Sequence, residues 1–254
     1  MISDTKVVAI GGGTGLSTML KGLKLHTHNI TAVVTVADDG GSSGILRSDL
    51  GMLAPGDVRN CVSALAEVDP VMGELLNFRF KDGSLKGHSL GNLFLAALNE
   101  TSSSFDEAVK KFSHLTGVVG TVYPVTNESV TLSALLEDGR LIEGESHIGV
   151  HHDGPKNGIV KLMVNPEKPK AVDGVIKALE KADIIVLGPG SLYTSIIPNL
   201  LVDGVVDAIK KSNAVKIYVC NIMSQAGETE NYTVSDHLAA IERHSYEGIA
   251  DIVI

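Results

Sequence analysis

Two glycine-rich segments, each directly after an apolar run, are the parts of this sequence best suited to bind an anion. The first is KVVAIGGGTG at residues 6–15, and the second is ADIIVLGPGS at residues 182–191. Glycine lets the chain turn with φ above zero and brings backbone N–H groups close to a ligand. The start of a following helix adds a positive end. The two segments therefore predict one crevice with phosphate on its floor.

A pair of acidic residues, Asp38 and Asp39, follows the next apolar run in the sequence VTVADDGG. In a dinucleotide-binding site an acid at this position binds ribose hydroxyls. A second interpretation is a Mg²⁺ ion that bridges substrate phosphates, because this ion takes few carboxylates and keeps its waters. A third is a helix cap or Asx turn. We favour a functional role, with Asp38 and Asp39 as the metal ligands, and as catalytic residues only if the protein is a transferase.

Several long polar side chains are further candidates for ligand contacts. Arg47 and Arg59 present forked donors that suit phosphate, although surface ion pairs would explain them equally well. Asn60, Asn92, Asn199 and Asn221 carry paired donors and acceptors that suit the edges of a base, a sugar or a peptide-like group. Each of these asparagines, taken alone, also fits a cap or turn.

Other sites that the sequence suggests are weaker. His147, His151 and His152 lie between strand-like segments, but their spacing favours a solvated loop over a metal site. The first glycine segment lacks the Lys-Ser/Thr end of a phosphate-binding P-loop, and Leu16 stands where a nicotinamide-dinucleotide motif has its third glycine. The sequence shows no nucleophile–base pair and no reactive-cysteine context. Any chemistry would therefore be transfer by positioning and charge neutralisation.

The elements around these residues predict an α/β fold of the Rossmann-like, doubly wound type. Apolar runs alternate with segments of helical spacing in the order strand, loop, helix, strand, which favours a mostly parallel sheet with helices on both faces. Residues 118–165 are richer in strand-forming residues and contain an Asp-Gly turn typical of a hairpin. We expect one domain over residues 1–254 with a small antiparallel excursion near 118–165, after which the strand at 159–165 rejoins the main sheet.

Composition limits the classes of function. The chain has 254 residues, 44% of them hydrophobic and 20% charged, and a net charge of −9. The negative charge argues against a broad nucleic-acid-binding face. The two cysteines lie far apart, which fits a reduced, cytoplasmic protein. No signal peptide is recognisable, and no apolar run approaches the roughly 20 residues of a membrane span.

Six motifs in series resemble the YvcK-like gluconeogenesis-factor proteins of bacteria. They are GGGTGLSTMLKGLK, VTVADDGGSSGILR, LAPGDVRNC, GHSLGNLFLAAL, VLGPGSLYTSIIPNLL and CNIMSQAGET. This group is similar to the 2-phospho-L-lactate transferases, the CofD-like superfamily of deazaflavin-cofactor synthesis. The resemblance covers the chain from its first strand to Thr229. Members carry a longer carboxyl-terminal part, so we expect further sequence beyond Ile254.

The resemblance implies a cytoplasmic, Rossmann-like protein that binds a nucleoside-diphosphate sugar of the UDP-N-acetylglucosamine type. It implies a role in cell shape and cell-wall supply during gluconeogenic growth. The hypothesis that we prefer is a binding protein with no turnover, and we expect a homodimer. By the matched motifs, Gly12, Gly13, Thr14 and Gly15 would face the nucleotide phosphates, and residues 188–192 would form the other wall. Together with the residues selected above, the candidate ligand-binding residues are Gly11, Gly12, Gly13, Thr14, Gly15, Asn92, Gly188, Pro189, Gly190, Ser191, Leu192, Asn199 and Asn221.

Two alternatives to a binding protein stay open. One is a magnesium-dependent transferase that moves a phospho-linked group from a nucleoside-diphosphate adduct, in which Asp38 and Asp39 match the acidic pair by the acceptor and metal. The small residues 40–44 depart from the bulkier ones of the transferases and speak against deazaflavin binding. The other alternative is a nicotinamide oxidoreductase.

Overall fold

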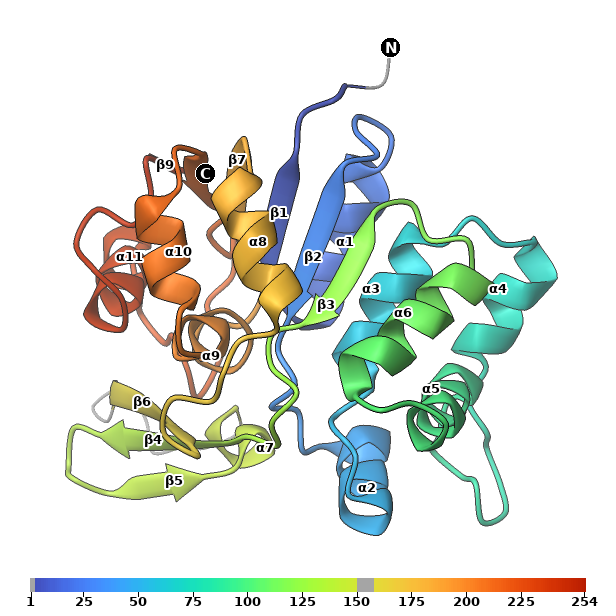
Figure 1. Ribbon diagram of the computed structural model, residues 1–254. Helices are drawn as coiled ribbons and strands as arrows, with labels where there is room; N and C mark the ends of the chain where they lie inside the picture. Colours follow the sequence, from blue (N-terminus) through green and yellow to red (C-terminus); the bar gives the residue numbers. More distant parts are fainter. Residues whose placement is uncertain (1–2, 150–157) are drawn as a thin grey trace.

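A parallel six-stranded sheet forms the centre of the structure, a computed structural model that describes residues 3–149 and 158–254 (Figure 1). The strand order is β3-β2-β1-β7-β8-β9, and every neighbouring pair is parallel. The strands are β1 (Val7–Gly11), β2 (Ile30–Val34), β3 (Thr121–Pro124), β7 (Ile184–Leu187), β8 (Val215–Tyr218) and β9 (Ile252–Val253). The first three strands follow one another from β1 through β2 to β3 at one edge of the sheet. The last three run from β7, on the other side of β1, through β8 to β9 at the opposite edge. The topological switch point therefore lies between β1 and β7.

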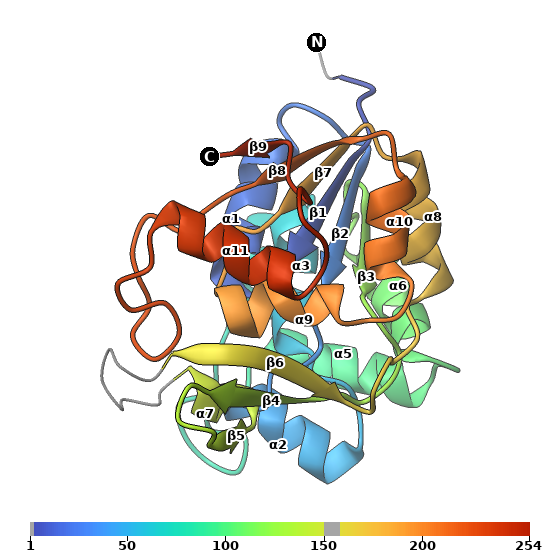
Figure 2. The same cartoon turned by 90° about the vertical axis from the view of Figure 1, so that its left-hand side faces the viewer.

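Helices cover both faces of this sheet, which confirms the predicted doubly wound fold. Figure 2 views the sheet close to its edge, with α1 on one side and α8 and α10 on the other. The helices are α1 (Gly13–Leu23), α2 (Gly41–Leu50), α3 (Gly56–Leu65), α4 (Pro70–Asn77), α5 (Leu90–Glu100), α6 (Phe105–Leu115), α7 (Glu145–Ile148), α8 (Asp173–Lys181), α9 (Ile197–Leu200), α10 (Val205–Lys211) and α11 (Val234–Arg243), with a π-helix η1 at Leu192–Ile196. Of the helices in the described ranges, none is both long and apolar enough to cross a bilayer.

The central strands are buried because their side chains are apolar on both faces. All five residues of β1 are buried, as are four of the five in β2. This is the pattern of a parallel sheet covered on both sides. Helix α1 begins at Gly13, inside the first glycine segment, so the glycine turn and the helix start are one structure.

A small antiparallel sheet of order β5-β4-β6 lies beyond the carboxyl ends of the central strands (Figures 1 and 2). It consists of β4 (Thr131–Leu136), β5 (Leu141–Glu143) and β6 (Ile159–Asn165). The predicted Asp-Gly turn joins β4 to β5 as a hairpin.

Two expectations about residues 118–165 were wrong. β3 is not part of the antiparallel excursion, because it pairs in parallel with β2 in the main sheet after a long helical crossover. β6 does not rejoin the main sheet but pairs with β4. Val160 and Lys161 are both exposed, so this strand is only partly buried, whereas a central strand of a parallel sheet is buried on both faces.

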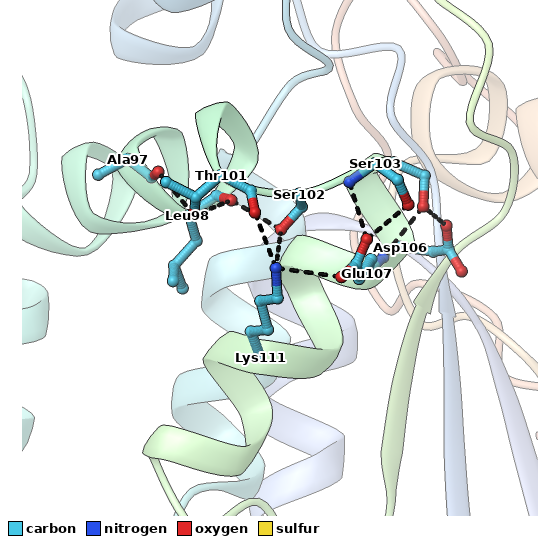
Figure 3. A network of polar contacts seen from close by, with 9 residues as sticks. Ala97, Leu98, Thr101, Ser102, Ser103, Asp106, Glu107 and Lys111 are labelled. Atoms are coloured by element: carbon cyan, nitrogen blue, oxygen red, sulfur yellow. Dashed lines mark hydrogen bonds and ion pairs between the residues drawn. The ribbon is translucent and has the colours of Figure 1, made fainter.

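The corner between α5 and α6 is an exposed polar network (Figure 3). The Lys111 ammonium donates to Thr101 O and to Ser102 Oγ at 2.9 Å each and pairs with the Glu107 carboxylate at 3.1 Å. Glu107 also accepts from the N–H and the hydroxyl of Ser103. These contacts with Ser103 and Lys111 lower the pKa of Glu107 to about 2.

Candidate functional site

The two glycine segments meet at the carboxyl edge of the sheet, as the sequence predicts. Gly11 ends β1 and Gly188 follows β7, and these two strands are parallel neighbours. A Cβ added to Gly15 would lie 2.8 Å from the Pro189 carbonyl oxygen, and one added to Gly190 would lie 3.3 Å from the Gly12 oxygen. The loops can approach this closely only because glycine has no side chain.

Positive backbone φ angles explain two further glycines. Gly13 has φ +66° and Gly188 has φ +81°, in the left-handed region that other residues rarely adopt. Gly188 lies between the carboxyl end of β7 and Pro189, and Gly13 begins α1. Each loop therefore makes its sharp turn at a glycine, directly outside the end of its strand.

Two predicted asparagines bind the backbone of these loops. The Asn199 side chain is fully buried, and its Nδ2 donates to Gly11 O at 3.1 Å and to Ser195 O at 2.7 Å. Asn221, which follows β8, donates through Nδ2 to Gly190 O at 2.7 Å. The structure therefore brings Asn199 and Asn221 to the glycine loops, where their amides contact carbonyls of the protein.

The segment after β8 also holds the start of η1. The buried Glu228 carboxylate accepts from the Tyr193 N–H at 2.9 Å and from the Thr194 hydroxyl at 3.0 Å. Gln225 accepts from the Ser191 hydroxyl at 2.8 Å and donates to Glu228 at 2.9 Å. Sequence reasoning did not select Gln225 or Glu228, although the polar run CNIMSQAGET after a strand was the available signal.

The predicted acidic pair is divided between two tasks. Both carboxylate oxygens of Asp39 accept backbone N–H groups at the start of α7, from Ser146 at 2.8 Å and from Glu145 at 3.0 Å. Asp38 accepts from Gly40 N at 2.9 Å, which is an Asx turn. Asp39 thus ties the end of β2 to α7, beside the small sheet. The Oδ2 atom of Asp38 accepts no hydrogen bond from residues 3–149 or 158–254.

Asp57 is the carboxylate that lies against the first glycine loop. A Cβ on Gly12 would be 2.6 Å from its Oδ2, and the Gly13 N–H donates to it. Burial, and then the negative charge of Asp38, raise the pKa of Asp57 to about 6. The sequence suggests a helix cap at this position, but the cap of α3 is Pro55 and Asp57 lies within the first turn.

Glu145 extends the group of acids near the end of β2. Burial raises its pKa to about 8, and the charges of Asp38, Asp39, Asp57 and Glu228 add to the effect. Carboxylates that raise one another's pKa share a region of negative potential. Within residues 3–149 and 158–254, no three His, Cys, Asp or Glu side chains are arranged to hold a metal ion.

Asn92 and the two predicted arginines lie in supporting positions. Asn92 is buried, accepts from Arg59 Nε at 3.2 Å and donates to Ser42 Oγ at 3.1 Å. Ser42 also contacts His88 Nδ1 at 2.9 Å. This network joins α2, α3 and α5, and none of these hydrogen bonds reaches the glycine loops.

The guanidinium of Arg47 is bound to the backbone. It donates to the carbonyls of Ala37 and Asp38 at 3.1 Å each and to Val130 O at 2.8 Å. It therefore braces the end of β2 against the segment that leads into β4. Of the three predicted loop histidines, His147 contacts Glu143 O at 2.8 Å, and His151 and His152 lie outside the described residues.

Glycine turns in contact at the switch point of a doubly wound sheet define an α/β protein of the Rossmann-like type. The chain belongs to the 2-phospho-L-lactate transferase CofD family, whose family model matches residues 7–254. Within that family it is similar to gluconeogenesis factors. It is 46% identical over 252 residues to the "Gluconeogenesis factor" of Bacillus subtilis, covering 98% of this chain and 78% of the relative.

A second relative and a solved structure agree with this assignment. The chain is 52% identical over 254 residues to the "Putative gluconeogenesis factor" of Clostridium acetobutylicum, and spans 56% of that relative's length. A crystal structure of a UPF0052 family member from Bacillus halodurans matches with a TM-score of 0.94 and 47% identity. That match covers all of this chain and 80% of the other. The resemblance inferred from the six motifs is confirmed.

Proposed function

We propose that this protein binds a nucleoside-diphosphate sugar of the UDP-N-acetylglucosamine type beside the two glycine loops. The observation that carries the proposal is the contact between the loops after β1 and β7, at the switch point of the sheet. A diphosphate needs several N–H donors, and glycine loops at strand ends supply them from the backbone. The residues proposed to line the ligand are those predicted at residues 11–15 and 188–192.

We propose further that the protein acts by binding, without turnover, and supports cell shape and cell-wall supply during gluconeogenic growth. The names of the Bacillus subtilis and Clostridium acetobutylicum relatives support the metabolic context. The task of Asp39 in holding α7 supports the absence of turnover, because it occupies one half of the predicted acidic pair. A cytoplasmic location is part of the same proposal.

The alternative is a magnesium-dependent transferase, which one observation favours. Asp57 and Asp38 interact through their charges beside the first glycine loop, and carboxylates are suitable donors for Mg²⁺. In this alternative Asp38 and Asp57, rather than Asp38 and Asp39, would hold the ion. When bound, the ion would neutralise charge on the diphosphate. The description of the matching family as a phospholactate transferase also supports it.

Binding and turnover are tested by two measurements on the same protein. Isothermal titration calorimetry with UDP-N-acetylglucosamine should give saturable binding, and NAD should give none. Incubation of the same protein with the sugar nucleotide and Mg²⁺ should release no UDP or UMP above the rate without protein. Release that disappears in Asp38→Asn would instead establish the transferase, and binding of NAD alone would support the oxidoreductase.

We also propose that the protein forms a homodimer. Apolar side chains on α4 are exposed, with exposed fractions of 64% for Val71, 46% for Met72 and 45% for Leu75. Contiguous apolar surface of this kind often marks an interface. Sedimentation velocity over a range of protein concentrations should give the mass of two chains, and a single-chain mass at every concentration would refute the dimer.

A further inference from the structure

Each glycine loop has one of its carbonyl oxygens bound by an asparagine amide, from Asn199 in α9 and from Asn221 in the segment after β8. Asn199 binds the carbonyl oxygen of Gly11 at the end of β1, and Asn221 binds that of Gly190 after β7. In each case the asparagine Nδ2 donates to the carbonyl oxygen of one loop peptide. The N–H of that peptide belongs to Gly12 in the first loop and to Ser191 in the second. The shared arrangement indicates a shared task.

The first carbonyl points away from β7. Gly11 O accepts from the N–H of Thr35, which follows β2, as well as from Asn199. β2 and β7 lie on opposite sides of β1. Because the N–H and C=O of a trans peptide point in opposite directions, the N–H of Gly12 is directed toward the β7 side.

The second carbonyl points away from β1. Gly190 O accepts from Asn221, which follows β8, and β8 and β1 lie on opposite sides of β7. The N–H of Ser191 is therefore directed toward the β1 side. Neither this N–H nor that of Gly12 donates to a protein acceptor within the described part of the chain. Both N–H groups thus converge on the interval between the tips of β1 and β7.

The orientation of the Asn199 amide is fixed by its surroundings. Its Nδ2 faces two carbonyl oxygens, so the opposite orientation would bring oxygen against oxygen. Its Oδ1 is buried and has no hydrogen-bond partner among the described residues. A buried oxygen without a donor is unfavourable. The position nevertheless keeps an amide, which supplies a donor to Gly11 and Ser195.

We infer that Asn199 and Asn221 are positioning residues that turn the Gly12 and Ser191 N–H groups toward one shared anion. They act through the backbone of the loops and do not read the base or the sugar. The inference rests on the proposed function, since it assumes a ligand with a diphosphate. In this inference the asparagine side chains fix the direction of the loop carbonyls, and the backbone N–H groups contact the phosphate oxygens.

The test uses inorganic pyrophosphate, which has neither base nor sugar. Asn221→Leu removes the donor without adding charge at a half-buried site, so the variant should fold. Asn213→Leu is the matched control, because Asn213 is exposed and precedes the same strand β8 at its other end. Affinities for pyrophosphate and for UDP-N-acetylglucosamine are measured by calorimetry, and thermal melting verifies that each variant is folded.

The inference predicts that Asn221→Leu lowers the affinity for both ligands by at least tenfold and by similar factors. Asn213→Leu should leave both affinities unchanged. Asn199→Leu should show the same parallel loss, and its melting temperature reports any cost at this buried site. A loss for the sugar nucleotide alone would overturn the inference and make Asn221 a base or sugar contact. Unchanged binding in Asn221→Leu would also overturn it while the proposed function stands. Binding of neither ligand by the unsubstituted protein would overturn both.

Discussion

The carboxyl edge of the central sheet and the corner between α5 and α6 treat their acids in opposite ways. At the corner, Glu107 is in water and has Lys111 and Ser103 as partners, and its pKa falls to about 2. At the sheet edge, Asp57 and Glu145 are withdrawn from water beside other carboxylates, and their pKa values rise to about 6 and about 8. The corner is built for a stable surface, whereas the edge keeps groups that disfavour folding. Such groups concentrate where a protein binds or reacts.

Replacing the buried acid at the edge should give the largest change in stability. Asp57→Asn keeps an acceptor for the Gly13 N–H and removes the buried charge. The rise from an ordinary pKa of 3.8 to about 6 corresponds to about 3 kcal/mol. Because the raised pKa makes the folded state hold a proton longer, this cost is absent below pH 3.8 and complete above about pH 6.

The measurement is urea unfolding of both proteins at several pH values. Asp57→Asn should be more stable than the unsubstituted protein by about 3 kcal/mol at pH 8 and by much less at pH 4.5. A variant that is less stable at pH 8 would mean that Asp57 contributes a favourable interaction, which would remove the contrast with Glu107.

Two glycines in α1 provide the next test, because they differ in what surrounds them. A Cβ at Gly15 would lie 2.8 Å from the Pro189 carbonyl, whereas one at Gly22 would have nothing within 4 Å. Gly15→Ala should destabilise the protein by about 1–3 kcal/mol by forcing the loops apart. Gly22→Ala, the matched control, should stabilise it by about 0.5–1 kcal/mol through helix propensity.

Unfolding in urea separates these two expectations, and calorimetry with a UDP-sugar adds a second readout. Gly15→Ala should lose ligand affinity and Gly22→Ala should retain it. Equal stability and affinity in the two variants would show that the close approach of the loops contributes neither to folding nor to ligand binding.

The sequence reveals the glycine loops, but not the residues that tertiary packing brings beside them. The glycine segments were recognisable because a glycine cluster after an apolar run is a local pattern, which marks a turn at the end of a strand. That the two segments meet follows from the order of the parallel strands. Asp57 was not recognisable as a site residue, because its place beside Gly12 depends on the packing of α3 against α1. In the same way, the sequence selects Asn199 and Asn221 as polar residues near the ligand, but only the fold shows that their amides face carbonyls.

Local sequence patterns also did not determine which strands pair with one another. β3 and β6 both read as strands in a β-rich segment, yet β3 joins the main sheet and β6 joins β4. The charged Lys161 within β6 was the signal available in the sequence, because a central strand of a parallel sheet is apolar on both faces.

The Glu145 side chain should show a pH window different from that of Asp57. Its pKa of about 8 lies above the ordinary 4.5, so ionisation opposes folding increasingly from pH 4.5 and fully above about pH 8. Glu145→Gln should therefore gain stability over the unsubstituted protein across that range. We expect about 1–2 kcal/mol at pH 8.5, because the water that still reaches the side chain screens part of the repulsion. A gain that is already complete at pH 6 would assign the effect to Asp57.

The smallest effect is expected at the corner, for Glu107→Gln. Because its pKa is lowered to about 2, Glu107 adds stability above pH 4.5 that is lost as the pH falls through 2. The pair with Lys111 is exposed and screened by salt. The variant should melt slightly lower at pH 7 in low salt and at the same temperature in 1 M NaCl. A large loss that persists in salt would mean that the hydrogen bonds from Ser103, and not the pair with Lys111, hold this corner. The low pKa of Glu107 would then arise from hydrogen bonding, and an exposed ion pair would no longer explain the contrast with Asp57.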